Sequence, residues 1–139
     1  MTQRLDARLD RYTPAVLSAF RIVFGLLFLL YGTSHAFSWP LDFQVPMGSW
    51  PVWWAGIIEV VTGGLILLGL FTRIAGFIAS GHMAVAYFWQ HQPLGLWPVG
   101  PPEMGGNGGT ESILFCFGFL LLVFTGGGAY ALDAVRGRR

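Results

Sequence analysis

Four predominantly apolar runs follow one another along the chain, separated by short polar, proline-rich or glycine-rich stretches. A helix needs about 20 such residues to cross the hydrocarbon core of a bilayer. The pattern predicts membrane-spanning helices at residues 14–37, 52–71, 73–89 and 110–132. The predicted fold is therefore all-α, an integral membrane four-helix bundle formed by a single domain. Its two long connections are residues 38–51 and 90–109.

Composition agrees with a lipid environment. Of the 139 residues, 54% are hydrophobic and 11% are charged, whereas a typical soluble domain has about 25% charged residues. The mean hydropathy is +0.59. A soluble protein of this size needs a largely charged surface, so the main partner is expected to be the lipid bilayer. The net charge of +1 gives no reason to expect a nucleic-acid partner, and the single cysteine, Cys116, excludes an internal disulfide.

The positions of arginine predict an orientation. Seven of the eight arginines lie on one side of the predicted helices: Arg4, Arg8, Arg11, Arg73, Arg136, Arg138 and Arg139. Cytoplasmic loops are enriched in Lys and Arg, so the N- and C-termini and the short turn at Arg73 are expected to be cytoplasmic. The two long loops would then face the opposite, outer side of the membrane. All six tryptophans fall on the loop side, as in an interfacial aromatic belt: Trp39, Trp50, Trp53, Trp54, Trp89 and Trp97.

Three ionisable residues, Arg21, Glu59 and His82, fall inside the predicted spans. Such residues are costly in a membrane and are functional candidates by default. At a rise of about 1.5 Å per residue, their depths differ by only a few turns. We therefore expect one polar ladder through the centre of the bundle. A second cluster is expected near the outer ends of the spans, formed by His35, His91, Asn107 and Glu111.

Glycines share helix faces with these ionisable residues. On the first helix, one face at three- and four-residue spacing holds Arg21, Gly25, Phe28, Gly32 and His35. On the second helix, one face holds Gly56, Glu59 and Gly63. Small residues let helices approach closely in lipid. The glycine faces are therefore predicted to be the packed faces, on which the charges would find partners.

Each candidate also has a structural interpretation. Glu59 with Arg21 would then be an ion pair that sets helix pairing, or Arg21 would extend to lipid phosphates. His82 would only hydrogen-bond a neighbouring helix, and Glu111 would complement the dipole of the helix it begins. The three histidines lie on separate elements without metal-ligand spacing, so no metal site is predicted.

Several segments together resemble the DoxX family of small bacterial membrane proteins with four spans. The most specific segment, E-x-x-x-G-G-L-x-L-x-G-L-x-T-R, runs from Glu59 to Arg73. Three others accompany it in the same order: R-I-V-F-G-L-L-F-L-L-Y-G-T-S-H, N-G-G-T-E-S and F-T-G-G-G-A-Y-A-L-D. The resemblance implies a four-helix membrane bundle and places Arg21, Glu59, Arg73 and Glu111 at family motif positions. His35 departs from the pattern, because a Lys is common there and His is mostly neutral at pH 7.

The resemblance also implies a link to quinone-coupled redox chemistry, since related proteins are named for a thiosulfate:quinone oxidoreductase subunit. The expected function is a redox-linked, quinone-associated membrane component that works with a partner oxidoreductase. Glu59 or His82 would exchange protons, and Arg21 would tune the charge of Glu59. No cofactor motif and no self-contained catalytic motif is evident in the sequence. Electrons are therefore expected to come from the partner.

Two other functions remain as alternatives. The first is a non-catalytic accessory or assembly subunit of a larger membrane complex, in which the Trp- and Pro-rich loops contact other membrane or periplasmic-side subunits. The second is a small-molecule transporter. Four short helices leave little lumen for a transport path, and no inverted repeat is visible in the sequence.

Overall fold

The computed structural model describes residues 1–137, and this part of the chain is helical without a strand. The prediction of an all-α protein is confirmed. The longer helices are α2 (Thr13–Phe37), α3 (Val52–Leu68), α4 (Thr72–Ala86) and α5 (Thr110–Thr125). The shorter elements are α1 (Thr2–Asp10), η1 (Tyr87–His91), η2 (Gln92–Leu94), η3 (Pro102–Met104) and α6 (Leu132–Arg136). Arg138 and Arg139, which contribute to the predicted orientation, lie outside the described residues.

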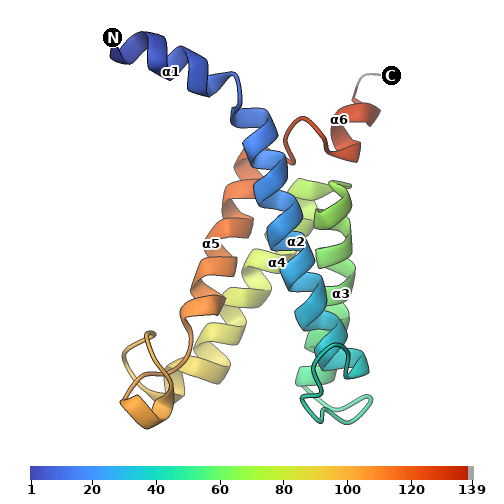
Figure 1. Cartoon of the computed structure of the whole chain (residues 1–139). Coiled ribbons are helices and arrows are strands. Elements are labelled where there is room, and N and C mark those ends of the chain that lie inside the picture. Colours follow the sequence, from blue (N-terminus) through green and yellow to red (C-terminus); the bar gives the residue numbers. More distant parts are fainter. Residues whose placement is uncertain (138–139) are drawn as a thin grey trace.

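The longer helices form two pairs, α2 with α3 and α4 with α5 (Figure 1). The pairs lie close together at the end that carries α6, here called the converging end, and α1 lies at the same end. They diverge toward the other end, here called the loop end, where residues 38–51 connect α2 to α3 and residues 90–109 connect α4 to α5. The candidate site lies in the space between the two diverging pairs.

Glycines bring α2 and α3 into close contact. A Cβ atom added to Gly25 would lie 2.6 Å from the backbone nitrogen of Leu67. One added to Gly32 would lie 2.6 Å from the backbone nitrogen of Val60. Side chains larger than hydrogen do not fit at such separations. The predicted glycine faces are thus the packed faces of this antiparallel pair, and the same contacts set its register.

The helix α3 ends at Leu68, three residues before the predicted boundary at residue 71. Gly69 adopts a left-handed conformation with φ of 72°. Its N–H donates to the Ile66 carbonyl at 3.0 Å, and the Leu70 N–H donates to the Leu65 carbonyl at 2.9 Å. These two bonds form a Schellman motif, in which the left-handed residue is usually glycine. A local backbone preference therefore ends this helix before its apolar run ends.

The run predicted as one helix over residues 110–132 is broken. The helix α5 ends at Thr125, where Gly126 and then Gly128 take positive φ values of 76° and 83°. Glycine loses the most backbone entropy in a helix, so three in a row favour a break. The chain turns back over the start of α2, with the Ala129 N–H donating to the Pro14 carbonyl at 3.2 Å. It then forms the short helix α6.

The third predicted helix, residues 73–89, also has different ends. It begins one residue earlier as α4 and is regular only to Ala86. The chain continues as the wider π-helical segment η1 to His91. The helical path therefore reaches further toward the loop end than predicted, and it carries His91 to the edge of the candidate site.

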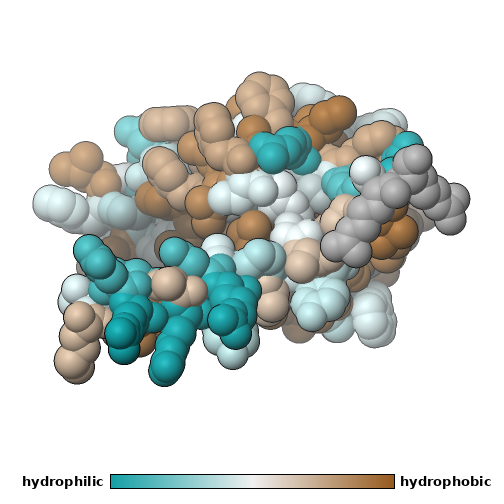
Figure 2. Space-filling view, turned by 90° about the horizontal axis from the view of Figure 1, so that it is seen from above, coloured by the Kyte–Doolittle hydropathy of each residue, from teal (hydrophilic) through white to brown (hydrophobic). Residues whose placement is uncertain are grey.

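The helix α1 is not predicted by the apolar pattern, because it is short and rich in charge. All of its residues are exposed, and Leu5 and Leu9 lie on one side with Arg4 and Arg8 beside them. Figure 2 looks onto the converging end and shows hydrophilic side chains gathered on the side where α1 lies. Elsewhere in this view, brown apolar side chains lie among residues of intermediate hydropathy.

Among the described helices, α2 is long and apolar enough to cross a membrane by length and composition. The helices α3 and α5 are apolar but shorter. Large apolar side chains are also exposed on the outer faces of the helices, including Ile74, Phe77, Leu114, Phe117 and Leu121. Such a continuous exposed apolar surface is unusual for a soluble monomer.

Candidate functional site

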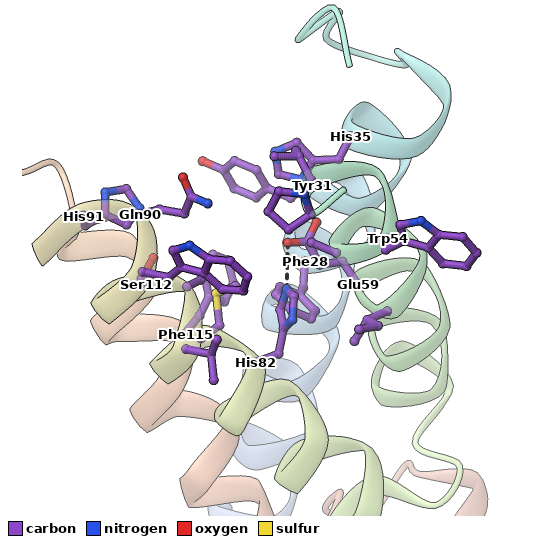
Figure 3. A pocket seen from close by; sticks show the side chains of 18 of the residues that line it. Phe28, Tyr31, His35, Trp54, Glu59, His82, Gln90, His91, Ser112 and Phe115 are labelled. Carbon is purple, nitrogen blue, oxygen red and sulfur yellow. Dashed lines mark hydrogen bonds and ion pairs between the residues drawn. The ribbon is translucent and has the colours of Figure 1, made fainter. Parts of the chain in front are cut away.

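A cavity of about 560 Å³ lies between the two helical pairs, on the side of the loop end. Pockets that bind small molecules generally enclose about 300–1,000 Å³. Apolar and aromatic side chains form most of its wall, among them Phe28, Trp54, Trp89 and Phe115. Figure 3 shows polar side chains from both helical pairs pointing into the same space. Apolar walls around a few convergent polar groups are typical of a binding site for a small organic molecule.

Glu59 of α3 is the central polar residue of this cavity, and it is 4% exposed. Its Oε2 atom lies 2.8 Å from Nδ1 of His35, which belongs to α2. Its Oε1 atom lies 3.3 Å from Nε2 of His82, which belongs to α4 (Figure 3). A buried carboxylate is costly unless it is paired and hydrogen-bonded. Both carboxylate oxygens of Glu59 have an imidazole partner.

The close packing of α2 on α3 explains why His35 reaches Glu59. A Cβ atom added to Gly32 would lie 2.8 Å from Cβ of Glu59, and one added to Gly56 would lie 2.8 Å from Cβ of His35. When Glu59 is ionised, it accepts hydrogen bonds from both rings, with the proton on Nδ1 of His35 and on Nε2 of His82. The sequence-predicted pair of Glu59 and His82 is therefore present, and His35 completes a group of three, here called the Glu59 triad.

A second carboxylate lines the cavity on the opposite pair of helices. The Tyr31 hydroxyl of α2 donates to Oε2 of Glu111 of α5 at 2.5 Å. Tyr31 lies one turn before His35, and the two ring centres are 6.2 Å apart. Glu111 also lies in the first turn of α5, where a negative charge complements the helix dipole. The cavity thus contains two carboxylates with different partners.

The predicted ladder of Arg21, Glu59 and His82 is wrong with respect to Arg21. Gly32 of α2 packs against Glu59 and Val60 of α3, so Glu59 lies level with Gly32. Gly32 comes 11 residues after Arg21, which corresponds to roughly 16 Å along α2. Arg21 lies toward the converging end and cannot pair with Glu59 or tune its charge directly. The level of each residue follows from the register of α2 on α3, which composition and spacing do not specify.

Arg21 instead binds backbone carbonyl groups. Its guanidinium donates to the carbonyls of Gly127 at 2.9 Å and Ile66 at 2.8 Å, and also to that of Leu67. The last carbonyls of α3 have no partner within the helix, and the C-terminal end of a helix dipole attracts a cation. The Arg21 side chain is buried, with the residue only 1% exposed. It therefore does not extend to lipid phosphates.

The predicted outer cluster is divided among three groups. His35 belongs to the Glu59 triad, and Glu111 bonds to Tyr31. His91 Nδ1 lies 2.9 Å from the carbonyl oxygen of Asn107. His35, His91 and Glu111 line the cavity, but Asn107 does not.

Asn107 organises the long loop. Its side chain is buried, and its Oδ1 atom accepts the Gly109 N–H at 2.8 Å. Its Nδ2 group donates to the Gly95 carbonyl at 2.9 Å and to the Tyr87 hydroxyl at 3.3 Å. One amide side chain therefore connects the start of the loop, its end and the η1 segment. Asn107 holds the frame of the cavity without bordering it.

Arg73 and Asp133 bind the backbone at the converging end. Arg73 donates to the carbonyls of Val123 at 2.7 Å and Phe124 at 2.8 Å, close to the end of α5. The Asp133 carboxylate accepts the N–H groups of Phe71 and Thr72, both at 2.8 Å, at the start of α4. Burial by itself would raise the pKa of the Asp133 carboxyl. The hydrogen bonds from Thr72 and Phe71 and the positive charge of Arg136 outweigh burial, so the pKa lies below its usual value.

The cavity also contains polar residues that were not singled out from the sequence: Tyr31, Gln90 and Ser112. Tyr31 lies one helical turn before His35, and Ser112 follows Glu111, so their spacing from predicted site residues was an available signal. Gln90 also adjoins a predicted site residue, His91, but the predicted helix ended at residue 89 and placed Gln90 in the loop. No group of three or more His, Cys, Asp or Glu residues in the described part of the chain is placed to hold a metal ion.

The fold and the cavity define a small all-helical protein with a buried carboxylate in an apolar binding space. The family model described as DoxX matches residues 16–92, which include the whole Glu59 triad. The chain is also 38% identical over 131 residues to an uncharacterized protein of Haemophilus influenzae, covering 90% of this chain and 93% of the relative. The chain belongs to the DoxX family. Family membership and the apolar helix α2 support a membrane protein, and no solved structure matches the chain.

Proposed function

We propose that the protein is a multi-pass protein of the bacterial inner membrane, with α2 to α5 as its spans and the converging end in the cytoplasm. The arginines at the converging end support this orientation, because both long connections at the loop end lack Lys and Arg. Reporter fusions after Gly48 and after Arg139 test it. A periplasmic reporter is expected at the first site and a cytoplasmic one at the second. Reporters on the same side would contradict the proposal.

We further propose that the cavity binds a quinone-type molecule and that the protein is a redox-linked membrane component working with a partner oxidoreductase. The observation that carries this proposal is the Glu59 triad at the centre of an apolar, aromatic cavity. A quinone presents a flat ring and carbonyl oxygens, which suit aromatic walls and imidazole N–H donors respectively. The cavity volume also falls within the range expected for such a ligand.

The residues of the triad would manage protons. Conversion of a quinone to a quinol adds two electrons and two protons, and the partner oxidoreductase would supply the electrons. An imidazole exchanges protons near neutral pH, and a carboxylate bonded to one ring nitrogen orients the ring and supports its protonated form. Glu59 would orient both His35 and His82 and would support the protonated form of either ring. The Tyr31–Glu111 pair provides a second group for proton exchange on another wall.

The test is extraction of bound quinone from protein purified in mild detergent. Wild-type protein is expected to retain quinone near one molecule per chain. Glu59→Gln should lower retention about tenfold, as expected for the loss of roughly 1.5 kcal/mol of charge-assisted hydrogen bonding. Glu103→Gln is the matched control, because Glu103 is exposed in η3 and does not line the cavity.

Two results together would overturn the quinone proposal. The first is wild-type protein with no more quinone than an unrelated membrane protein purified from the same membranes. The second is unchanged quinone-linked turnover by the partner oxidoreductase when Glu59→Gln replaces the wild type.

We keep a non-catalytic accessory subunit as the second candidate function, because of the loop from residue 94 to 104. Asn107 orders this loop, yet the loop exposes Leu96, Trp97, Val99 and Met104. Exposed apolar side chains on an ordered segment are typical of a protein contact surface. Val99→Glu should then remove a stoichiometric partner from detergent pull-downs, whereas Glu103→Gln in the same loop should not. A wild-type protein that purifies without any partner would contradict this role.

A further inference from the structure

The exposed side chains that border the cavity form two groups of different character. One group is apolar and comes from α3, α4, η1 and the residues just before α3, with exposed fractions of 40% to 72%: Trp50, Trp54, Ile58, Ile78, Val85 and Trp89. The other group is polar and lies at the loop end, where Gln90 and Glu111 are exposed and His91 is partly exposed. Gln90 and His91 lie together in Figure 3, across the cavity from Tyr31 and His35.

Most of the remaining lining is buried or half-buried. Phe28, Met83 and Ser112 line the cavity and are buried. The ends of the cavity that reach the surface are therefore the apolar edge between α3 and α4 and the polar edge at the loop end. In the proposed orientation, the apolar edge faces lipid tails and the polar edge faces the periplasmic side.

The apolar edge lies directly beside the Glu59 triad. Ile58 precedes Glu59 on α3, and Gly81 precedes His82 on α4. Gly81 is exposed, lines the cavity, and lies at one-turn spacing between Ile78 and Val85. A Cβ atom added to Gly81 would meet no other atom within 4 Å. Packing therefore does not require glycine here, and its missing side chain leaves space at this edge.

We propose that the gap between α3 and α4 at Gly81 is a lateral portal through which a lipid-soluble ligand enters the cavity from the membrane. The ligand class is a small polar head with hydrogen-bonding oxygens joined to an apolar tail. The head binds beside Glu59, and the tail stays between Ile58 and Val85 in contact with lipid. The polar edge at Gln90 and Glu111 exchanges protons with water. This inference rests on the proposed function of the cavity and specifies how its ligand arrives.

Steric closure of the portal tests the inference. Gly81→Phe places an aromatic ring at the portal without a backbone clash. Gly64→Phe is the matched control, because Gly64 lies on α3, does not line the cavity, and also has open space around an added Cβ atom. Both substitutions replace a helical glycine with the same side chain. They therefore have the same effect on helix propensity.

The full chain is reconstituted in nanodiscs of phosphatidylcholine and phosphatidylglycerol, and binding is followed by quenching of tryptophan fluorescence. One ligand is a long-chain benzoquinone delivered through the bilayer, and the other is a chain-less benzoquinone added from water. Gly81→Phe should slow quenching by the long-chain ligand about tenfold, as expected for an obstructed association step. Gly64→Phe should leave this rate unchanged. The chain-less ligand should bind both variants at the wild-type rate.

Equal rates for the two variants with the long-chain ligand would overturn the portal. Slowing of both ligands by Gly81→Phe would also overturn it, because the obstructed route would then serve water as well. If neither quinone binds the wild type, the proposed function fails, and a membrane-partitioned aryl diazirine takes the place of the quinones. Photolabelling near Phe28 and Phe115 that is lower in Gly81→Phe than in Gly64→Phe would support the portal. Equal labelling would overturn it.

Discussion

At the converging end, Arg21, Arg73 and Asp133 bind backbone groups at helix ends, whereas at the loop end Glu59 binds the side chains of His35 and His82. Helix ends leave carbonyl and N–H groups without partners, and a charged side chain that satisfies them holds the helices together. Two imidazoles on one carboxylate do something different, because their nitrogen and oxygen atoms can bond to a ligand in the cavity as well as to one another. The first end therefore holds the helices together, and the second presents the polar groups to which the proposed ligand would bind.

The largest expected effect is on stability at the converging end. Arg21→Met removes the charge-assisted hydrogen bonds that the guanidinium donates to the buried carbonyls of Gly127, Ile66 and Leu67. This should lower the free energy of unfolding by about 3 kcal/mol or more. Arg21→Lys keeps the charge but lacks the planar fork, so its effect should be intermediate. Denaturant-induced unfolding in detergent measures both. A loss no larger than that of Glu59→Gln would contradict the assignment of stability to this end.

The next effect separates stability from binding at the loop end. Glu59→Gln keeps the shape of the side chain but weakens its bonds to His35 and His82, so stability should fall by about 1.5 kcal/mol. Quinone retention by the folded protein should fall about tenfold, since the two histidines lose their anionic partner. Arg21→Lys should show the opposite pattern, with lower stability and normal retention in the folded fraction. Parallel losses of stability and retention in both variants would remove the distinction between the two ends.

A smaller effect is expected from the carboxylate that begins α4. Asp133→Asn weakens the two hydrogen bonds from Phe71 and Thr72, which should cost about 1 kcal/mol at neutral pH, as for other helix caps. The folded pKa of Asp133 is lowered, so its contribution is present above the unfolded value near 3.8. The contribution is lost as the pH falls below that value through the folded pKa.

Thermal unfolding at a series of pH values measures this contribution. The difference between wild type and Asp133→Asn should be constant from pH 7 to about pH 5 and should shrink below about pH 4. Asp6→Asn in the exposed helix α1 is the control and should match the wild type. A difference that grows as the pH falls would contradict stabilisation by the ionised form of the carboxylate.

The smallest expected effect concerns the second carboxylate of the cavity. Tyr31→Phe removes the bond to Glu111, but Glu111 is exposed and water can replace the lost donor. The loss of stability should therefore stay below about 1 kcal/mol. Quinone retention should change less than in Glu59→Gln. Extraction of bound quinone measures the retention of the two variants. A larger loss of retention than in Glu59→Gln would make the Tyr31–Glu111 pair the principal polar site of the cavity.

Several features of the fold could be predicted because they depend on short stretches of sequence. The apolar runs place the longer helices, and the glycines at three- and four-residue spacing place the contact between α2 and α3. Helix ends were less accessible, since Gly69 and Gly126 stop helices inside apolar runs that hydropathy alone extends. The helix α1 was missed because a short charged helix has no apolar run to reveal it.

The sequence by itself determined which residues are candidates for the site, because ionisable side chains in apolar helices are few and each needs a partner. Glu59, His82 and His35 were all identified in this way. Only the tertiary structure decided which partner each one has. The register of α2 on α3 places Arg21 beside backbone carbonyls and His35 beside Glu59, since a shift along a helix changes the level of every side chain at once. The divergence of the two helical pairs then opens the cavity, and no pattern within a single helix encodes that divergence.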